Sequence, residues 1–175
     1  SITQDGNENS STIVQTATSS GSSAITTQFG NQNDSLITQS GTGASATVSQ
    51  TDVPSGNGRP RLRGDDGRDV AGGDPVRANW SNIMQSGDGV AADITQSGDL
   101  NRSEVLQSGD GADAKLNQSG IFNNSQIEQN ADSFADVMQG GAYGDNNSQI
   151  TQNANSASAT VNQSADSTFP TYFPT

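Results

Sequence analysis

The sequence contains no cysteine and no histidine. Without cysteine the fold can have neither disulfide bonds nor thiol chemistry. Without histidine it lacks the side chain that most often acts as a general base and as a zinc ligand. The 175 residues must therefore fold without covalent cross-links. We expect no enzyme activity, no catalytic residue, no cofactor and no metal ion.

Apolar side chains are also scarce. Hydrophobic residues make up 29% of the chain and aromatic residues 5%, and the mean hydropathy is −0.67. Such a composition by itself is typical of a disordered chain and leaves too little apolar surface for an ordinary two-layer core. No apolar run approaches the roughly 18 to 20 residues of a membrane helix, so we expect no membrane insertion. The start at Ser1, without a signal segment, suggests a mature, exported chain.

Positive charge is the third shortage. Seven Lys and Arg residues face 19 Asp and Glu residues, which gives a net charge of −12. Nucleic-acid binding relies on clustered Lys and Arg, so we expect no nucleic-acid partner. Only Arg102 and Lys115 lie outside residues 51–79, so the remainder of the chain should present an acidic surface.

Glutamine, in contrast, recurs with a period. Eight of the twelve steps between successive members of one glutamine series are eleven residues long, and most of the irregularity falls in one step of 35. The series consists of Gln4, Gln15, Gln28, Gln39, Gln50, Gln85, Gln96, Gln107, Gln118, Gln129, Gln139, Gln152 and Gln163.

Two further positions follow this register. The residue two places before each glutamine is aliphatic in twelve of thirteen cases, Thr26 being the exception. The residue four places before alternates strictly between Ser and Ala, also across the long step, so the true period is 22 residues. The aliphatic core predicted from this pattern comprises Ile13, Ile37, Val48, Ile83, Ile94, Val105, Leu116, Ile127, Val137, Ile150 and Val161.

Residues spaced by two lie on the same side of a β-strand, so Ser or Ala, an aliphatic residue and Gln should share one inward face. Gly, Asn and Asp between the units are typical of tight turns, as at residues 86–89. Asn33, Asn79, Asn101, Asn123 and Asn146 open Ser-type units near the turn exit. We predict an all-β fold, a β-solenoid of strand-turn-strand coils of about 22 residues with two facing parallel, in-register sheets. Each buried Gln should then bond the Gln of the next coil, forming a stacking ladder.

A single coil buries only two aliphatic side chains, so stability has to come from stacking on neighbouring coils. The end coils would expose unpaired backbone and unpaired amides, and the repeat begins abruptly at Ser1 without a cap. We therefore expect the protein to bind itself, as a head-to-tail homopolymer in which each molecule continues its neighbour's solenoid.

The units at residues 33–50, 101–118 and 146–163 resemble curlin repeats, with their Asn/Ser, Gln, Gly, Asn, Ala and Gln pattern. The resemblance implies a subunit of curli-type functional amyloid, extracellular, at the cell surface or in the biofilm matrix of a Gram-negative-type bacterium, with roles in adhesion and cohesion. It further implies a secretion pore in the outer membrane and a minor nucleator subunit. The chain departs from the family in its six and a half repeats, its insertion, its missing N-terminal targeting stretch and its aromatic tail.

Four segments are expected: curlin-like repeats at 1–50, an Arg/Asp/Gly/Pro-rich insertion loop at 51–79, further repeats of the same solenoid at 80–163, and an aromatic, proline-containing tail at 164–175. The insertion contains Arg63-Gly64-Asp65, which we interpret as a solvated turn rather than an integrin motif. Its aspartates at 65, 66, 69 and 74 fit no standard calcium-binding spacing. Seven Ala-type and six Ser-type strands leave one Ser-type position open at each junction, which the tail could fill.

Three other functions remain open. A monomeric adhesin stalk would use the same solenoid without polymerising. An ice-binding solenoid would need a regular outward threonine array, and Met84, Leu106, Glu128 and Met138 interrupt it. An enzyme would need carboxylates that converge on a pocket, whereas those of this chain are scattered over turns and outward positions.

Overall fold

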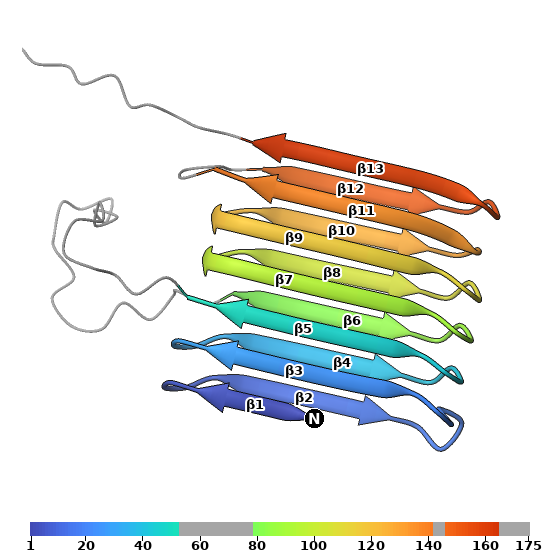
Figure 1. The fold of residues 1–175 in the computed structure, drawn as a ribbon, viewed down its shortest axis with the longest axis horizontal. Helices are drawn as coiled ribbons and strands as arrows, with labels where there is room; N and C mark the ends of the chain where they lie inside the picture. Colours follow the sequence, from blue (N-terminus) through green and yellow to red (C-terminus); the bar gives the residue numbers. More distant parts are fainter. Residues whose placement is uncertain (53–78, 142–145, 165–175) are drawn as a thin grey trace, which may run out of the picture.

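The computed structural model describes residues 1–52, 79–141 and 146–164, and this part of the chain consists of strands joined by short turns (Figure 1). No helix long and apolar enough to cross a membrane occurs in these three ranges. The strands are β1 (Ile2–Asp5), β2 (Ser10–Gln15), β3 (Ser23–Phe29), β4 (Asp34–Gln39), β5 (Ser45–Thr51), β6 (Trp80–Gln85), β7 (Ala91–Asp99), β8 (Arg102–Gln107), β9 (Asp113–Ile121), β10 (Asn124–Gln129), β11 (Ser133–Gly140), β12 (Asn147–Gln152) and β13 (Ala157–Ser164).

The strands form two facing sheets. Odd-numbered strands make a seven-stranded sheet in the order β1-β3-β5-β7-β9-β11-β13, and even-numbered strands make a six-stranded sheet from β2 to β12. Every neighbouring pair is parallel and in register, so that Ile37 lies beside Ile83 and Gln39 beside Gln85. The predicted fold class, a β-solenoid, is confirmed. We call one odd strand and the even strand that follows it a rung.

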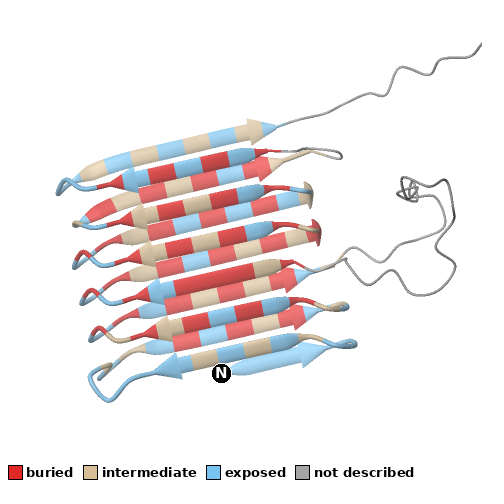
Figure 2. Cartoon of the chain, turned by 180° about the vertical axis from the view of Figure 1, so that it is seen from behind, coloured by how far each residue is buried: buried red, intermediate tan, exposed pale blue. Residues whose placement is uncertain are grey.

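The core lies between the two sheets. Buried and more exposed residues alternate along most interior strands (Figure 2), as expected where successive side chains point to opposite faces. β6 is an exception, because its outward Asn82 is also buried. One apolar cluster runs through the stack from Ala24 to Ile150, with Val161 packed against it. The side chains of β1 are all exposed, because no strand covers it on its outer edge.

The solenoid continues without a break across the insertion. β5 pairs with β7 and β4 pairs with β6, and these pairings keep Val48 beside Ile94 and Ser35 beside Ser81. The insertion thus connects β5 to β6 in the sequence. The interpretations of Arg63-Gly64-Asp65, of the insertion aspartates and of the tail concern residues that lie outside the described ranges.

Candidate functional site: stacked amide ladders

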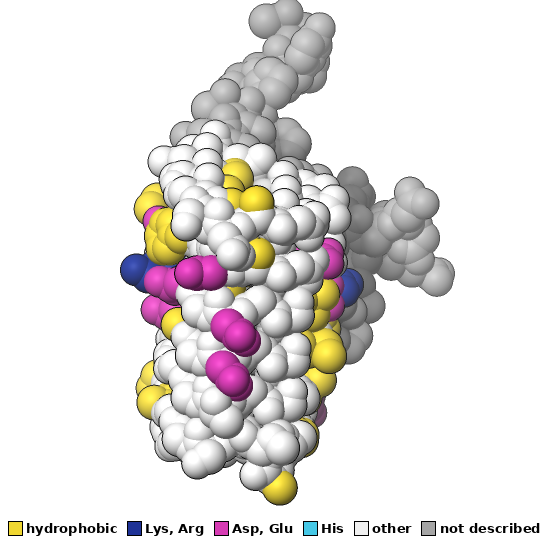
Figure 3. All heavy atoms as spheres, turned by 90° about the vertical axis from the view of Figure 1, so that its right-hand side faces the viewer, with side chains coloured by type: hydrophobic (Ala, Val, Ile, Leu, Met, Phe, Trp, Pro, Cys, Tyr) yellow, Lys and Arg dark blue, Asp and Glu magenta, His cyan; other side chains and the backbone are white. Residues whose placement is uncertain are grey.

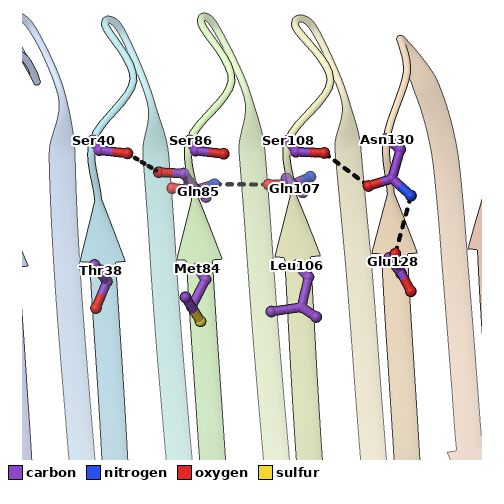
Figure 4. Close-up of a pocket in the computed structure, with 10 residues that line it drawn as sticks. All are labelled: Thr38, Ser40, Met84, Gln85, Ser86, Leu106, Gln107, Ser108, Glu128 and Asn130. Carbon is purple, nitrogen blue, oxygen red and sulfur yellow. Dashed lines mark hydrogen bonds between the residues drawn. The ribbon is translucent and has the colours of Figure 1, made fainter.

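The thirteen glutamines of the repeat form two ladders, one within each sheet. Except in Gln152 and Gln163, which end the two ladders, each Nε2 atom donates to the Oε1 atom of the glutamine on the next strand of the same sheet, at 2.7 to 3.0 Å. Figure 4 shows one such bond, from Gln85 to Gln107. All eleven bonds run in the same direction, from the earlier glutamine to the later one.

The same glutamines also join the two sheets. Gln107 Nε2 donates to the carbonyl oxygen of Ala91 at 2.7 Å, and Gln118 Nε2 donates to that of Arg102 at 2.9 Å. A backbone carbonyl can only accept, so these contacts identify the atom that faces across as the amide nitrogen. Each inner glutamine therefore holds both its neighbour along the stack and the strand opposite.

Burial of the ladder follows position in the stack. Ten of the thirteen glutamines are buried, with 6% or less of their surface exposed. Gln4 and Gln15 at one end are exposed, and Gln163 at the other end is half-buried. The two strand edges that end the stack thus leave ladder amides accessible.

The predicted aliphatic residues lie between the sheets beside the ladders. Nine of the eleven are buried, and Ile13 and Val161 are partly buried at the two ends. Thr26, the one exception in the aliphatic position, is also fully buried, and its Oγ1 atom lies 3.5 Å from Ser35 Oγ. A hydroxyl partner on the facing strand allows this polar residue inside the core.

A third ladder, of asparagines, is not among the features predicted from the sequence. The Nδ2 atom of each donates to the Oδ1 atom of the preceding one at 2.8 to 3.2 Å, opposite to the glutamine direction. Four of the six also close the turn before them, as where Asn101 Nδ2 donates to Ser97 O at 3.3 Å; this atom donates in addition to Gly120 O at 3.0 Å. The ladder consists of Asn9, Asn33, Asn79, Asn101, Asn123 and Asn146.

A sequence signal for this ladder existed. An asparagine stands six residues before every glutamine of the six-stranded sheet, including Gln15. Asparagine is also the ordinary residue of a turn exit, so its position alone suggested turn chemistry. Invariance at that position within the chain, with no replacement by Asp, Ser or Gly, is the feature that distinguishes a ladder from a turn.

Comparison with protein families agrees with this geometry. The family model described as "Curlin associated repeat" matches residues 20–51 and 91–120. The chain thus contains curlin-associated repeats. The two matches include β3 to β5 and most of β7 to β9, on either side of the insertion. No curated protein and no solved structure matches the chain significantly.

Glycines in the turns of this curlin-repeat protein allow the rungs to approach. Gly98 has a φ of 105°, and a Cβ atom added there would overlap the carbonyl oxygen of Gly120 on the next rung. Gly120 is in the same relationship to Gly141. Only glycine combines this backbone conformation with so short a distance between turns.

One member of this glycine column is an aspartate. Asp52, which follows β5, occupies the position that Gly30 holds after β3 and that Gly98 holds near the end of β7. It accepts hydrogen bonds from Asn31 N at 2.6 Å and from Asn79 Nδ2 at 3.1 Å. Burial raises the pKa of this carboxyl group, and the nearby Asp99 raises it further, against the hydrogen bonds that lower it.

The outer surface of the curlin repeats is acidic at the turns between even and odd strands (Figure 3). Asp88 Oδ1 accepts a bond from Thr42 N at 2.8 Å, and Asp110 Oδ1 accepts one from Asp88 N at 2.8 Å. The bond from Thr42 lowers the pKa of Asp88. These carboxylates repeat along the stacking axis and place like charges above one another.

A shallow groove lies on the outer side of the six-stranded sheet (Figure 4). Its outward column contains Thr38, Met84, Leu106 and Glu128, which lie beside one another on successive strands. Glu128 is the single ionisable side chain among the residues that line the groove. The column has four different side chains and is not the regular threonine array that an ice-binding surface needs.

Proposed function

We propose that this curlin-repeat protein is the structural subunit of an extracellular, curli-like amyloid fibre, in which each molecule continues the solenoid of its neighbour. The supporting observation is that the two ends of the stack carry the same inward chemistry. At one end β2 presents Ser11, Ile13 and Gln15; at the other end β12 presents Ser148, Ile150 and Gln152. An edge of this kind fits a second copy as well as it fits its own neighbouring strand.

The hydrogen bonds of the glutamine ladders all run in one direction, and this distinguishes the two ends of the stack. Along both glutamine ladders the donor points toward the β12 and β13 end, and acceptors remain at the β1 and β2 end. Two molecules in the same orientation therefore bring donors to acceptors. In the opposite orientation donors would meet donors, each left without a partner at roughly 1 to 3 kcal/mol per group. The contact is head-to-tail and does not close, which produces a filament.

The biological role follows from the curlin family. We propose that the fibre is part of the cell-surface or biofilm matrix of a Gram-negative-type bacterium, where it provides adhesion and cohesion. Its other partners would be a secretion pore in the outer membrane and a minor subunit that nucleates the fibre. The chain acts in this role as building material and not as an enzyme.

Assembly of the purified chain tests the proposal. Light scattering followed over hours should rise as fibres form, and aligned fibres should diffract at about 4.8 Å along the fibre axis, the spacing of paired strands. Preformed fragments should remove any lag. A chain that stays as dispersed single particles under these conditions would be a monomeric adhesin stalk, and the fibre proposal would be wrong.

A further inference from the structure

The two sheets contain unequal numbers of strands, and this sets a constraint on any junction between molecules. In the described residues the seven-stranded sheet ends at β1 and β13, and the six-stranded sheet ends at β2 and β12. If β1 of one molecule stacked on β13 of another, the odd sheet would be continuous. The even sheet would then lack one strand between β12 and the next β2.

A gap of this size would disrupt the core. Neighbouring strands lie about 4.8 Å apart, so β12 and the following β2 would be separated by about twice that distance. Gln152 and Ser148 would have no ladder partner above them, and a cavity would open beside Val161. Buried polar groups and apolar surface without partners are both costly.

β1 forms the shortest strand pairing in its sheet. It pairs with β3 over four residues, whereas β13 pairs with β11 over eight. All four of its side chains are exposed, including Ile2 at 45%. Its partner β3 is in contrast well buried, with Thr26 and Gln28 at 0% exposure. The edge of β3 can pair with a strand as long as β3 itself, and β1 covers only part of this edge.

β13 carries the residues that suit that position. When Gln163 is set beside Gln28, Val161 falls beside Thr26 and Ala159 beside Ala24, in the same columns as in the rest of the sheet. In this register β13 covers the whole of β3, from Ser23 to Phe29. β1 covers only the part from Thr26 onward.

The ladder bonds are preserved by the replacement. Gln4 Nε2 now donates to Gln28 Oε1 at 2.7 Å, and Gln163 Nε2 points in the same direction along the stack. Gln163 would therefore make the bond that Gln4 gives up. On the other sheet Gln152 Nε2 would meet Gln15 Oε1, and the next molecule's Asn9 Nδ2 would meet Asn146 Oδ1, as in the interior of the ladders.

We propose that molecules of this chain join by strand exchange: β13 of one molecule replaces β1 on β3 of the next, and β12 then pairs with β2. Each molecule thereby contributes six strands to each sheet, and neither sheet has a gap. This inference rests on the proposed fibre function and specifies its junction. The partner is a second copy of the chain, and the surface is the edge of β3 together with that of β2.

Disulfide cross-linking of the full-length chain tests the junction directly, since the protein has no cysteine of its own. Asn162 and Thr27 face outward in the same column, as does Thr3. Fibres are co-assembled from Asn162→Cys with Thr27→Cys molecules, or from Asn162→Cys with Thr3→Cys molecules, then oxidised and dissolved. Strand exchange predicts covalent dimers in the first mixture and none in the second.

The opposite result, dimers only with Thr3→Cys, would show end-on stacking without exchange and overturn the inference while leaving the fibre intact. Fibres without dimers in either mixture would also overturn it. Failure to form fibres at all would instead refute the proposed function. The axial rise per molecule in a fibre reconstruction is a second readout: six strand spacings, about 29 Å, for exchange, against about 34 Å for end-on stacking.

A disulfide that fixes β1 to β3 tests whether β1 must dissociate from β3 before the next molecule can bind. A disulfide between Thr3→Cys and Thr27→Cys, which are register partners, would hold β1 on β3. Seeded elongation should be lost in the oxidised protein and return on reduction. The matched control is Ser49→Cys with Thr95→Cys, a register pair in the same column inside the stack, which should elongate equally in both redox states. Equal elongation of the clamped protein would overturn the exchange.

Discussion

The amide nitrogen of Gln107 lies 2.9 Å from the amide oxygen of Gln129 on the next even strand, and it also lies 2.7 Å from the carbonyl oxygen of Ala91 on the facing sheet. One side chain thus bonds along the stack and across it. Its own Oε1 atom accepts from Gln85 at 2.9 Å. Every interior glutamine of the repeat stands in a similar double relationship, so the ladders and the sheet packing depend on the same atoms.

Replacing Gln107 by Leu should therefore lower stability strongly. The change leaves Gln85 Nε2, Gln129 Oε1 and the Ala91 carbonyl without this partner, at a cost of roughly 1 to 3 kcal/mol for each group left unsatisfied. Denaturant midpoints of fibres and seeded growth rates measure the effect. Glu104→Gln, at the outward position directly before Val105 on the same strand, is the control and should change both quantities little. Equal losses in the two variants would contradict the inward assignment.

Asn101→Ala should destabilise the solenoid by a similar mechanism at the turns. Asn101 is 1% exposed, and its Oδ1 atom accepts bonds from Asn123 N at 3.2 Å and Asn123 Nδ2 at 2.9 Å. We expect a loss of several kcal/mol, since each buried unsatisfied group costs about 1 to 3 kcal/mol. Asn124→Ala provides the comparison, because the Asn124 side chain is exposed and its Nδ2 atom donates to Asn147 Oδ1 at 3.2 Å. A fibre equally tolerant of both changes would mean that the asparagine ladder adds no stability.

Gly98→Ala and Gly89→Ala distinguish two roles of glycine in the turns. One role is to adopt a positive φ, and the other is to leave room for the backbone of the next rung. Both glycines have positive φ, 105° and 64°, so alanine at either position adds a backbone cost of roughly 1 to 2 kcal/mol. Gly89 has open space around it, whereas a Cβ atom on Gly98 would overlap the Gly120 carbonyl. Thermal unfolding should therefore show the larger loss for Gly98→Ala. The reverse order would indicate that the rungs can separate locally at little cost.

Asp52 should make the stability depend on pH. Burial raises its folded-state pKa above the ordinary value of an aspartate, so the protonated carboxyl group favours the folded state. This contribution is complete below the unfolded pKa and is lost as the pH rises through the folded pKa. Asp52→Asn should therefore flatten the decline in unfolding free energy as the pH is raised from acid toward neutral.

Asp88→Asn provides the control of opposite sign. The hydrogen bond from Thr42 lowers the pKa of Asp88, so its contribution is present above the unfolded pKa and is lost as the pH falls through the folded pKa. The variant should thus lose stability at neutral pH and not in acid. Titration of unfolding midpoints between acid and neutral pH distinguishes the two profiles, and identical profiles would contradict the assignment of Asp52.

Much of the architecture was predictable from the sequence because the repeat uses identical residues at identical positions. The Ser and Ala alternation, as in Ser103 and Ala114, separates the two sheets, and the phase that survives between Gln50 and Gln85 predicts that β5 and β7 are neighbours. Thr26 shows the limit of a rule based on hydropathy. It occupies an aliphatic position and is buried, since Ser35 on the opposite strand supplies a hydroxyl partner.

Other features were not predictable, because they depend on contacts between rungs. Leu100 and Phe122 adopt left-handed conformations, with φ of 59° and 60°, although neither residue favours them. Each precedes a ladder asparagine, Asn101 or Asn123, whose bonds to adjacent rungs hold the turn. The opposite directions of the amide ladders likewise appear only when nitrogen and oxygen positions are known.

The in-register columns described above have a consequence for how such a protein can vary. Because Ile83, Val105 and Ile127 meet equivalent neighbours above and below, a duplicated or deleted segment of 22 residues would preserve the inward columns of Ser or Ala, aliphatic and Gln residues. The length of such a protein can thus change by whole repeats without any compensating substitution. A gain or loss of eleven residues would instead exchange the two sheets and place Ser columns against Ala columns. Proteins built in this way should therefore differ in chain length by whole numbers of coils.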